Sequence, residues 1–521
     1  MKSLNYTLLS LLLSSLSATK LTQFLQDKIS KSNDTNQFYD ILVQLTPVEF
    51  HSYKCHSGGD YEKVANAKAK WVLKTVQNHS NSTSELILPT IHKLQTEKHI
   101  LNSEKFFLTN TLSLQADAQA IKELDQLAVV KEISSDAVIK SYLDLSAYNA
   151  GGYAIDVNNG NSSDCNSKLQ RRDDVYYDNW HVLKIGVTKK VRNFIANKTP
   201  LVIGFPDTGV NYQHEAVSEN YRGNVGNGNI EHDYNWFDAI TDNDPLYPNK
   251  ICPPNSPAPC DDNGHGTMVS SLAISTDIIG VNPNSKWIAC RNMNQGFSTL
   301  SAYLRCLEFM FAPTRRDGTN PNVELRPHVV NHSYGCQEDE GCSPTSFNRA
   351  IASLKEAGII SVKSSGNSGE KGCSSMTTQP VSAPHIYNVG GLAYNSNSRF
   401  SSSSVGPIAG RGVSTNLMAP GNRITVAEYS ENGMYGVYDG TSLSAPQVGA
   451  AALIVMQACP HYLRRVDMVM QLLEYTATPL YSSMGCGGDN SSTRPNNEYG
   501  YGLINVEKAV KTCLAEINQR L

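Results

Sequence analysis

Three features that would place a chain in a large class of proteins are missing from this sequence. It has no excess of positive charge, because 44 Lys and Arg stand against 48 Asp and Glu for a net charge of -4. Nothing therefore favours binding to nucleic acid or to an anionic membrane. It has no C-x-x-C pair, which argues against a zinc or redox site. Beyond the N-terminal segment no apolar stretch reaches roughly 18 residues, so we expect no transmembrane anchor in the mature chain.

The first 18 residues have the pattern of a secretory signal peptide. Lys2 supplies a positive charge, residues 8–16 are rich in Leu and Ser, and the small residues Ser17 and Ala18 follow. A charge, a short apolar segment and small residues at the cleavage point are the marks of such a signal. We therefore expect a signal peptide at 1–18 and a secreted or extracellular protein, with the lumen of a lysosome or vacuole as the alternative.

The cysteines and the glycosylation sequons agree with an oxidising route. There are 12 cysteines, so several disulfides are expected, although spacing alone does not give their connectivity. Proximity in loops suggests Cys252 with Cys260, and Cys336 with either Cys342 or Cys373. The sequons include those at Asn161, Asn197 and Asn490.

Residues 19–142 have the pattern of a small α+β module. Apolar residues alternate along 39–45, as on a half-buried strand, and recur at helical spacing along 61–76. The other expected elements are a strand at 107–114, a helix at 117–127 and a strand at 129–139 that is broken by a turn.

Residues 143–173 are expected to be a linker, because Gly, Asn, Ser and charged residues dominate much of this segment. The linker ends in Arg171-Arg172-Asp173. One interpretation is a solvated charged loop. The other is a processing site, because proteolysis concentrates in exposed loops.

Residues 174–521 alternate between strand and helix patterns, which predicts an α/β unit with a mostly parallel sheet. Residues 201–205 form a continuous apolar run of strand length, typical of a strand buried on both faces. The further strands are expected at 287–290, 329–330, 359–362 and 387–389, and helices at 266–275, 299–311, 347–356 and 448–458.

Ser442 lies in the stretch GTSLSAP, residues 440–446, which opens the apolar run 448–456. A helix that is apolar all round is buried, and Pro446 fits if it lies in the first turn. Ser442 would then lie at the buried N-terminus of a helix, beside unpaired N–H groups and the positive end of the helix dipole. That environment suits a nucleophile whose reaction develops negative charge. The alternative is a simple helix cap.

Two further polar residues follow or precede apolar elements. Asp207 closely follows the run 201–205, which puts its carboxylate at the C-terminal end of a parallel strand, where ligand sites collect. A turn is the alternative; an aspartic-protease dyad is a poor one, because no second Asp-Thr-Gly or Asp-Ser-Gly occurs. His265 lies between two glycines, which permit close approach, and its imidazole titrates near neutrality, as a general base must. A satisfied surface or core histidine is the alternative.

Asn367 lies in a Gly- and Ser-rich stretch after the apolar run 359–362. Such an asparagine is most often a turn residue. Beside an acyl-transfer site its amide could instead donate a hydrogen bond to a developing oxyanion.

The chain order Asp207, His265, Ser442 is that of subtilisins. Here the chain resembles the subtilisin family of serine peptidases, and the resemblance covers roughly residue 180 to the C-terminus. The motifs are PDTGV at 206–210, NGHGT at 263–267 and GTSLSAP at 440–446. The resemblance implies a three-layer α/β/α fold with a mostly parallel sheet. Met268, the pair Phe205-Pro206 and Ser444 depart from the usual family residues, but none removes a catalytic group.

The resemblance also implies roles for single residues. Ser442 would attack the peptide carbonyl, His265 would transfer the proton, and Asp207 would orient the imidazole. Asn367 matches the oxyanion-hole asparagine of the family. Ser333, Tyr334 and Gly335 match the edge that pairs with the backbone of a protein or peptide substrate. The sequon at Asn331 would lie beside this cleft, so we expect it to be unused.

The module 19–142 resembles the inhibitory propeptides of subtilisins, which implies an intramolecular inhibitor that also assists folding. The mature chain would begin after self-cleavage following the 139–148 segment, or after Arg172. No cofactor is required for this chemistry. A cluster of acidic residues could hold a structural calcium ion, or could be a solvated loop, since it lacks EF-hand spacing. The acidic residues are Asp233, Asp238, Asp242, Asp244, Asp261 and Asp262.

The sequence thus predicts a secreted, self-processing serine endopeptidase. Two other functions stay open. One is a catalytically silent binding protein with the same fold, although all four site residues are present. The other is a convertase that cleaves at a specific sequence.

Overall fold

The computed structural model describes residues 19–32, 37–50, 53, 60–136, 138–140, 146–147, 155–156, 179–242, 244, 251–430 and 432–520. The predicted signal peptide at 1–18 and the sequon at Asn161 lie outside these residues. Most of the predicted linker, including Arg171-Arg172-Asp173, also lies outside the described residues. The same is true of the immediate surroundings of both proposed cleavage points.

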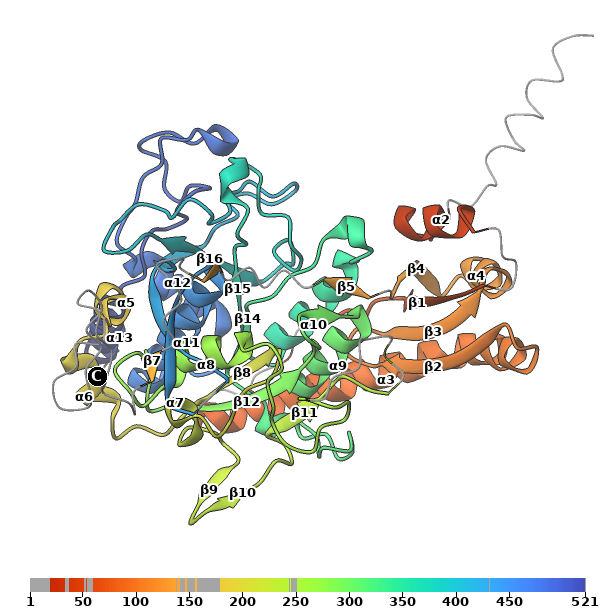
Figure 1. Cartoon of the computed structure of the whole chain (residues 1–521), viewed down its shortest axis with the longest axis horizontal. Coiled ribbons are helices and arrows are strands. Elements are labelled where there is room, and N and C mark those ends of the chain that lie inside the picture. The colour runs from red at the N-terminus through yellow and green to blue at the C-terminus, as the bar shows by residue number, and fades with distance from the viewer. Residues whose placement is uncertain are drawn as a thin grey trace, which may run out of the picture.

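A parallel sheet of seven strands forms the centre of the C-terminal unit, which confirms the predicted fold class (Figure 1). All neighbouring strands in the sheet run parallel. In order across the sheet the strands are β11 (Trp236–Asp238), β12 (Lys286–Arg291), β8 (Val202–Asp207), β14 (Val329–His332), β15 (Ile360–Ser364), β16 (Ile386–Leu392) and β17 (Leu417–Pro420).

Helices cover both faces of the sheet, and this explains why its strands read as continuous apolar runs. Val329 packs into one hydrophobic cluster with residues of α8 (His265–Ile274) and α11 (Ser444–Ala458). The next residue, Val330, packs into a second cluster with α9 (Leu300–Phe311) and α10 (Pro344–Glu356). Successive side chains of a strand point to opposite faces, so both faces are buried.

Helix α11 is buried along its whole length, as its apolar sequence predicts. It lies directly on the sheet, because a Cβ at Gly449 would come within 3.3 Å of side chains on β8, β14 and β15. Two C-terminal helices, α12 (Val466–Thr476) and α13 (Val506–Arg520), pack against it. The layers are therefore helix, sheet and helix.

The N-terminal module is an antiparallel sheet of four strands in the order β2, β3, β1, β4. The strands are β1 (Phe38–Leu45), β2 (Ile100–Phe106), β3 (Thr111–Asp117) and β4 (Val130–Ser135), and the helices are α2 (Gln23–Ser30), α3 (Tyr61–Thr96) and α4 (Ala118–Asp125). The predicted strand at 107–114 begins too early, because residues 107–110 form the turn between β2 and β3, and only 111–114 lie in β3. The predicted helix at 61–76 is real but continues to Thr96.

Helix α3 belongs to both units of the molecule. Ile91 and Leu94, near its C-terminus, are buried in the core of the N-terminal module. Val72 and Val76, nearer its N-terminus, are buried among residues of α9 and α10 in the sheet unit. In Figure 1 the helix accordingly runs out of the module and along the sheet unit.

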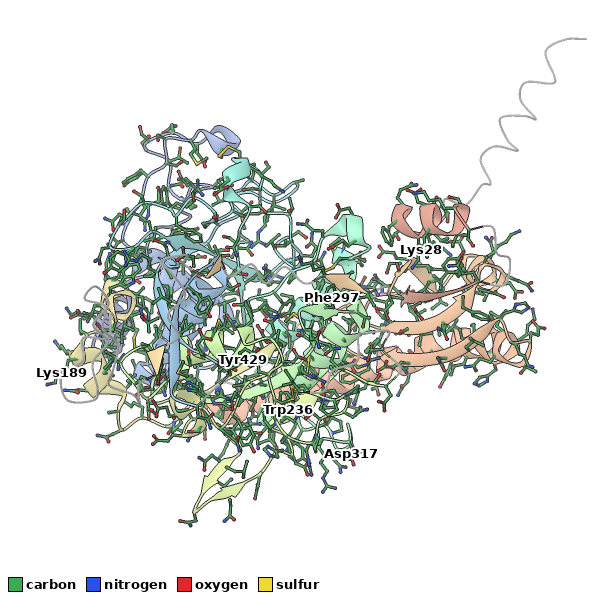
Figure 2. All side chains as sticks on the ribbon, in the orientation of Figure 1. Lys28, Lys189, Trp236, Phe297, Asp317 and Tyr429 are labelled. Atoms are coloured by element: carbon green, nitrogen blue, oxygen red, sulfur yellow. A yellow bond between two sulfur atoms is a disulfide. The ribbon has the colours of Figure 1, made fainter. Side chains whose placement is uncertain are left out.

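Short strands continue the contact between the two units. Strand β5 (Ile139–Lys140) pairs antiparallel with β13 (Phe297–Ser298), and Phe297 lies at the junction of the units in Figure 2. Strands β6 (Ser146–Ala147) and β7 (Ile155–Asp156) pair with β19 (Met434–Asp439). The remaining elements are α5 (Trp180–Lys184), α6 (Lys189–Ile195), α7 (Glu215–Ser218), β9 (Asn224–Gly226), β10 (Asn229–Ile230) and β18 (Ile424–Ala427).

Five disulfides join described residues. The predicted pair Cys252–Cys260 is confirmed, and Cys336 pairs with Cys342. The alternative Cys336–Cys373 is wrong, because Cys373 pairs with Cys486 across 113 residues of sequence. The other two pairs are Cys290–Cys306 and Cys459–Cys513. None of the helices in the described ranges is both long and apolar enough to cross a membrane.

Candidate active site

Asp207 and His265 form a buried hydrogen-bonded pair at the C-terminal edge of the parallel sheet. Asp207 is the last residue of β8, a strand near the middle of the sheet, and is fully buried. His265 is the first residue of α8 and is 1% exposed. The distance from its Nδ1 to Oδ1 of Asp207 is 2.7 Å, so Nδ1 carries the proton and donates it to the carboxylate. Nε2 is thereby left as the basic atom of the ring.

The glycines on either side of His265 permit the start of α8 to lie close to the loop that follows β8. Gly264 has a φ of 99°, and a Cβ at this position would come within 2.4 Å of the Tyr429 ring. A Cβ at Gly266 would lie 1.9 Å from the carbonyl oxygen of Gly209. Any larger residue would therefore push α8 away from the loop after β8, as the pattern around His265 suggested.

Asp261 ties these two segments together, a role that the sequence did not reveal. Its Oδ1 accepts hydrogen bonds from Thr208 Oγ1 at 2.8 Å and from the Gly264 N–H at 2.8 Å. Its Oδ2 accepts from both the N–H and the hydroxyl of Thr267, at 3.0 and 2.6 Å. A buried carboxylate at the N-terminus of α8 thus fixes the helix start to the loop that follows Asp207.

Ser442 lies in a 3-10 turn, Thr441–Leu443, directly before α11, and is 2% exposed. This turn is in contact with α8. Its Oγ donates to the carbonyl oxygen of Ser333 at 2.9 Å, and the Ser333 hydroxyl donates to the Ser442 carbonyl at 2.8 Å. Nε2 of His265 is buried and has no hydrogen-bond partner among the described residues.

Asn367 is held by the residue that precedes Ser442. Its Oδ1 accepts hydrogen bonds from the N–H and from the hydroxyl of Thr441, both at 2.9 Å. The two bonds fix which end of the carboxamide is the oxygen, so Nδ2, a donor, forms the other end. Asn367 and Ser442 line the same pocket.

The stretch Ser333 to Gly335 follows the end of β14, beside Ser442. The Tyr334 side chain belongs to the core, because it is fully buried and stacks on Tyr303 with the ring centroids 4.8 Å apart. Only the backbone of this stretch is therefore suited to contact a substrate. Asn331 is fully buried and its Nδ2 donates to Ser333 Oγ at 2.8 Å, in agreement with an unused sequon.

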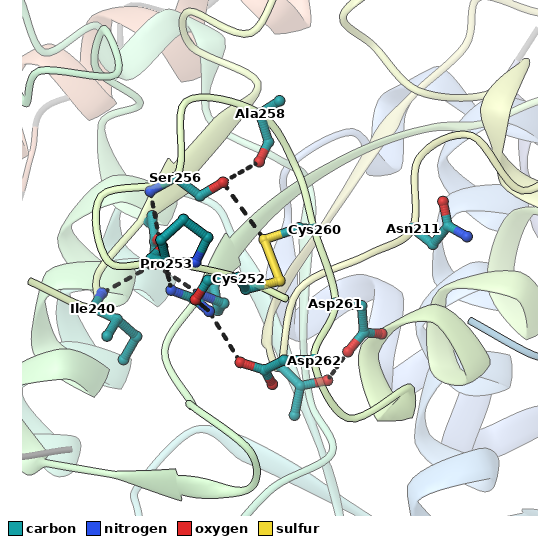
Figure 3. The surroundings of a disulfide bond; sticks show 12 residues. Asn211, Ile240, Cys252, Pro253, Ser256, Ala258, Cys260, Asp261 and Asp262 are labelled. Atoms are coloured by element: carbon teal, nitrogen blue, oxygen red, sulfur yellow. Dashed lines mark hydrogen bonds and ion pairs between the residues drawn. A yellow bond between two sulfur atoms is a disulfide. The ribbon is translucent and has the colours of Figure 1, made fainter. Parts of the chain in front are cut away.

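Several of the acidic residues proposed as calcium ligands form ion pairs with arginines. Asp238 and Asp262 both form ion pairs with the buried Arg291, at 2.9 and 3.0 Å. Asp244 pairs with Arg305 at 2.9 Å. Figure 3 shows Asp261 and Asp262 following the Cys252–Cys260 disulfide. In the part of the chain that is described, no group of three or more His, Cys, Asp or Glu side chains is arranged to hold a metal ion.

The residues that depart from the family pattern are accommodated without loss of the Asp207–His265 bond. Phe205 and Met268 are buried in the core. The hydroxyl of Ser444 donates to the carbonyl oxygen of Pro420 at 3.1 Å. Their polar and apolar groups are therefore satisfied away from the reacting atoms.

Comparison with known proteins identifies the family. The sequence model described as "Subtilase family" matches residues 198–502, which is more than half of the chain. The chain belongs to the subtilase family. This confirms the resemblance inferred from the three motifs, and at the level of the family the chain is a serine peptidase.

Individual relatives match parts of this subtilase. Bacillopeptidase F of Bacillus subtilis (strain 168) is 32% identical over 324 residues, which are 60% of this chain but only 20% of that protein. The chain thus matches about one fifth of the length of bacillopeptidase F. Subtilisin DY of Bacillus licheniformis is 30% identical over 256 residues, 48% of this chain and 79% of that protein.

A solved structure resembles the whole fold. It is the crystal structure of the epidermin leader peptide processing serine protease of Staphylococcus aureus, with a TM-score of 0.58 and 17% sequence identity. The superposition covers 91% of this chain and 98% of that one, so it extends into the N-terminal module. At this identity the likeness concerns the fold alone.

Proposed function

We propose that this subtilase is a secreted serine endopeptidase that uses Asp207, His265 and Ser442 as a catalytic triad and is made as a self-processing zymogen. The observation that carries the proposal is the 2.7 Å bond between His265 Nδ1 and the buried Asp207. Together with a buried Nε2 that lacks a partner among the described residues, it leaves the imidazole oriented and basic.

In the proposed mechanism Ser442 attacks the peptide carbonyl while His265 Nε2 accepts the hydroxyl proton. The hydroxyl must first leave the Ser333 carbonyl oxygen, to which it donates at 2.9 Å. Rotation about χ1 of Ser442 achieves this between staggered positions. Asp207 holds the tautomer and stabilises the imidazolium, which then gives its proton to the leaving amine.

The negative charge that develops on the carbonyl oxygen would be met by two donors, Asn367 Nδ2 and the Ser442 N–H. The bonds from Thr441 to Asn367 Oδ1 support this assignment, because they turn the NH₂ group away from Thr441. Removing one such donor typically lowers kcat by about 10² to 10³-fold. An extended substrate would pair with the backbone of Ser333, Tyr334 and Gly335.

The N-terminal module is proposed to be the inhibitory propeptide. Its last described residues, Ile139 and Lys140, add a short antiparallel strand to β13, which follows the end of β12 at the edge where Asp207 lies. The next described residue, Ser146, pairs with Asp439, three residues before Ser442. Lys140 thus pairs at this edge of the sheet, and Ser146 pairs close in sequence to the proposed nucleophile. We therefore expect self-cleavage between them, with a cut after Arg172 as a second event.

Secretion is proposed from the segment 1–18 and is supported by the five disulfides, which persist in oxidising compartments. The substrates would be proteins or peptides. The Staphylococcus aureus enzyme is named as a leader peptide processing protease. Whether this subtilase is a broad protease or a processing enzyme depends on the pocket beside Ser442.

Expression of the full chain and of Ser442→Ala tests the proposal. We expect the unchanged chain to be cut between Lys140 and Ser146, as read by N-terminal sequencing, and to degrade a denatured protein. Ser442→Ala should accumulate uncut and be inactive. Ser444→Ala, which removes a neighbouring hydroxyl that bonds to Pro420, is the matched control and should be processed. Normal processing and proteolysis by Ser442→Ala would contradict the proposal.

A further inference from the structure

A lysine is buried beside the candidate nucleophile without a counter-charge. Lys363, the penultimate residue of β15, is 1% exposed. Its Nζ donates to the carbonyl oxygen and to the hydroxyl of Ser364, at 2.7 and 3.0 Å, and both acceptors are neutral. Among the described residues it forms no ion pair with a carboxylate, and burial is the one cause that lowers its pKa, to about 7.

Burying an ammonium group is costly unless an anion or several acceptors compensate it. The neighbours of Lys363 do not supply an anion. On β14 its register partner is His332, whose pKa burial lowers to about 3 and which is therefore neutral. On β16 the register partner is Asn388. An uncharged side chain would fill this site at lower cost, so the lysine calls for an anion that the described residues do not supply.

The lysine lines a pocket that also contains the proposed reacting groups. The pocket is lined by Lys363, Ser364, Gly366, Asn367, Ser368, Thr378 and Ser442. Among these described lining residues, Lys363 is the one with a charged side chain. Thr378 packs closely against Gly335 and Gly366. A Cβ at Gly335 would lie 2.7 Å from the Thr378 Cβ, and a Cβ at Gly366 would lie 3.3 Å from the Thr378 Oγ1.

The position of the pocket determines which part of a substrate enters it. In the proposed reaction the carbonyl carbon lies at Ser442 Oγ and its oxygen at Asn367 Nδ2. The side chain of the residue that contributes this carbonyl is attached one bond away. We assign this side chain, on the acyl side of the bond that is cleaved, to the pocket that Ser442 and Asn367 line together with Lys363.

We propose that this pocket selects an aspartate or glutamate on the acyl side of the cleaved bond, with the Lys363 ammonium group as its counter-ion and the hydroxyls of Ser364 and Thr378 as additional donors. The inference rests on the proposed function, since it names the substrate class of the same site. Lys363 is then a specificity residue. The substrate carboxylate supplies the anion that the described part of the chain does not, and the two hydroxyls satisfy the remaining acceptor sites of the carboxylate.

Matched peptides test the proposal with the processed enzyme. Peptides that differ at one position, Glu against Gln and Asp against Asn, isolate the charge at nearly constant shape. We expect kcat/KM to be about tenfold to a hundredfold higher for the acid of each pair, the range for a hydrogen bond between charged groups. In Lys363→Met the ratio should fall to about one. Equal cleavage of both members by the unchanged enzyme would overturn the proposal.

The pH dependence of the same ratio provides a readout that does not need a variant. Lys363 is charged below about pH 7 and neutral above it, so the Glu to Gln ratio should be highest near pH 6 and approach one near pH 9. His265 affects both peptides equally and cancels in the ratio. His332 and Tyr334 do not interfere, because burial lowers the pKa of the first and raises that of the second out of this range. A ratio that does not change with pH would contradict the role of Lys363.

Failure of this inference can be told from failure of the proposed function. If Gln and Leu peptides are cleaved but acids are not preferred, only the assignment of the pocket is wrong. If no peptide is cleaved and a fluorophosphonate does not label Ser442, the proposed function itself is wrong. Labelling of Lys363→Met by the same reagent shows that the variant has folded. If that variant does not fold, the comparison of Glu with Gln and its pH dependence decide the question.

Discussion

The two units of the molecule share a hydrophobic core but differ in what their polar residues do. In the sheet unit, Asp207 and His265, which come from distant segments, are hydrogen bonded at one edge of the parallel sheet, and the turn that carries Ser442 contacts α8. In the N-terminal module, the buried polar groups hold the module's own helix or meet the sheet unit. Thr83 Oγ1, for example, donates to the carbonyl of His79, and Leu108 donates its N–H to Glu308.

This difference shows that the residues that join the two units are not the residues of the candidate active site. Helix α3 inserts Val72 and Val76 into the core that lies under α9 and α10, and Arg326 of the sheet unit donates to Asn66 Oδ1 on the same helix at 2.7 Å. These contacts stabilise the assembly but involve none of the residues that bond to Asp207, His265 or Ser442. Variants in the two units should therefore affect different measurements.

The largest expected effect is on catalysis and lies in the sheet unit. Asp207→Asn keeps the size of the side chain but favours the wrong tautomer of His265, so kcat should fall by about 10⁴-fold while the fold is retained. Asp233→Asn is the matched control, because Asp233 forms a surface ion pair with Arg316 at 3.2 Å. Peptide hydrolysis by the two variants measures the effect. A decrease in kcat of less than tenfold in Asp207→Asn would contradict the proposed role of Asp207.

The next effect is on stability and lies in the module. Val72→Asp would bury a carboxylate in the shared core, at a cost of several kcal/mol. We expect the melting temperature of the uncut Ser442→Ala chain to fall by about 5 °C or more. Asn78→Asp introduces the same side chain at an exposed position of α3 and should change the melting temperature little. Equal melting temperatures would show that α3 does not stabilise the sheet unit.

The smallest expected effect is a change in the pH dependence of release of the module. Burial raises the pKa of Glu308 to about 8, and the Leu108 N–H bonds to it at 2.8 Å. Burial also raises the pKa of Asp136, which bonds to the Ser301 N–H, to about 6. Because both carboxyls hold protons more tightly in the complex, the module should bind most tightly at low pH and weaken as pH rises toward 8.

Glu308→Gln tests this pH dependence, because it keeps the acceptor for Leu108 but removes the titration. Gel filtration of the processed enzyme at several pH values measures how much of the cut module remains bound. The variant should retain more module at neutral pH and show a flatter profile than the unchanged chain. Identical profiles would mean that Glu308 does not govern the release.

The sequence predicted the sheet unit better than the module, for physical reasons. The strands around Ile203 and Val362 read clearly because both of their faces are buried. The sequence pattern predicts only the first part of helix α3, because residues 77–96 contain Asn, Ser, Thr and Pro89, which are unfavourable in helices. Within the helix these hydroxyls bond back to the preceding turn, as Ser84 does to the Ser80 carbonyl at 2.6 Å.

Two residues of the site could not be found from the sequence. Asp261 was one acid in an acidic loop, and only its bonds to Thr208 and Thr267, across the gap between β8 and α8, reveal its role. Lys363 lies near the end of a short strand, where a lysine is expected to reach solvent. The apolar pair at residues 107–108 suggested a strand that is not there. Leu108 is buried by contact with the sheet unit and not as part of a strand.

The central claim is that Asp207, His265 and Ser442 act as one catalytic group, and covalent labelling tests it most directly. A fluorophosphonate should attach to Ser442 of the processed enzyme, with the modified peptide identified by mass spectrometry, and the rate should fall steeply in Asp207→Asn. Ser442→Ala should not be labelled. Labelling at another serine, or an unchanged rate in Asp207→Asn, would contradict the account.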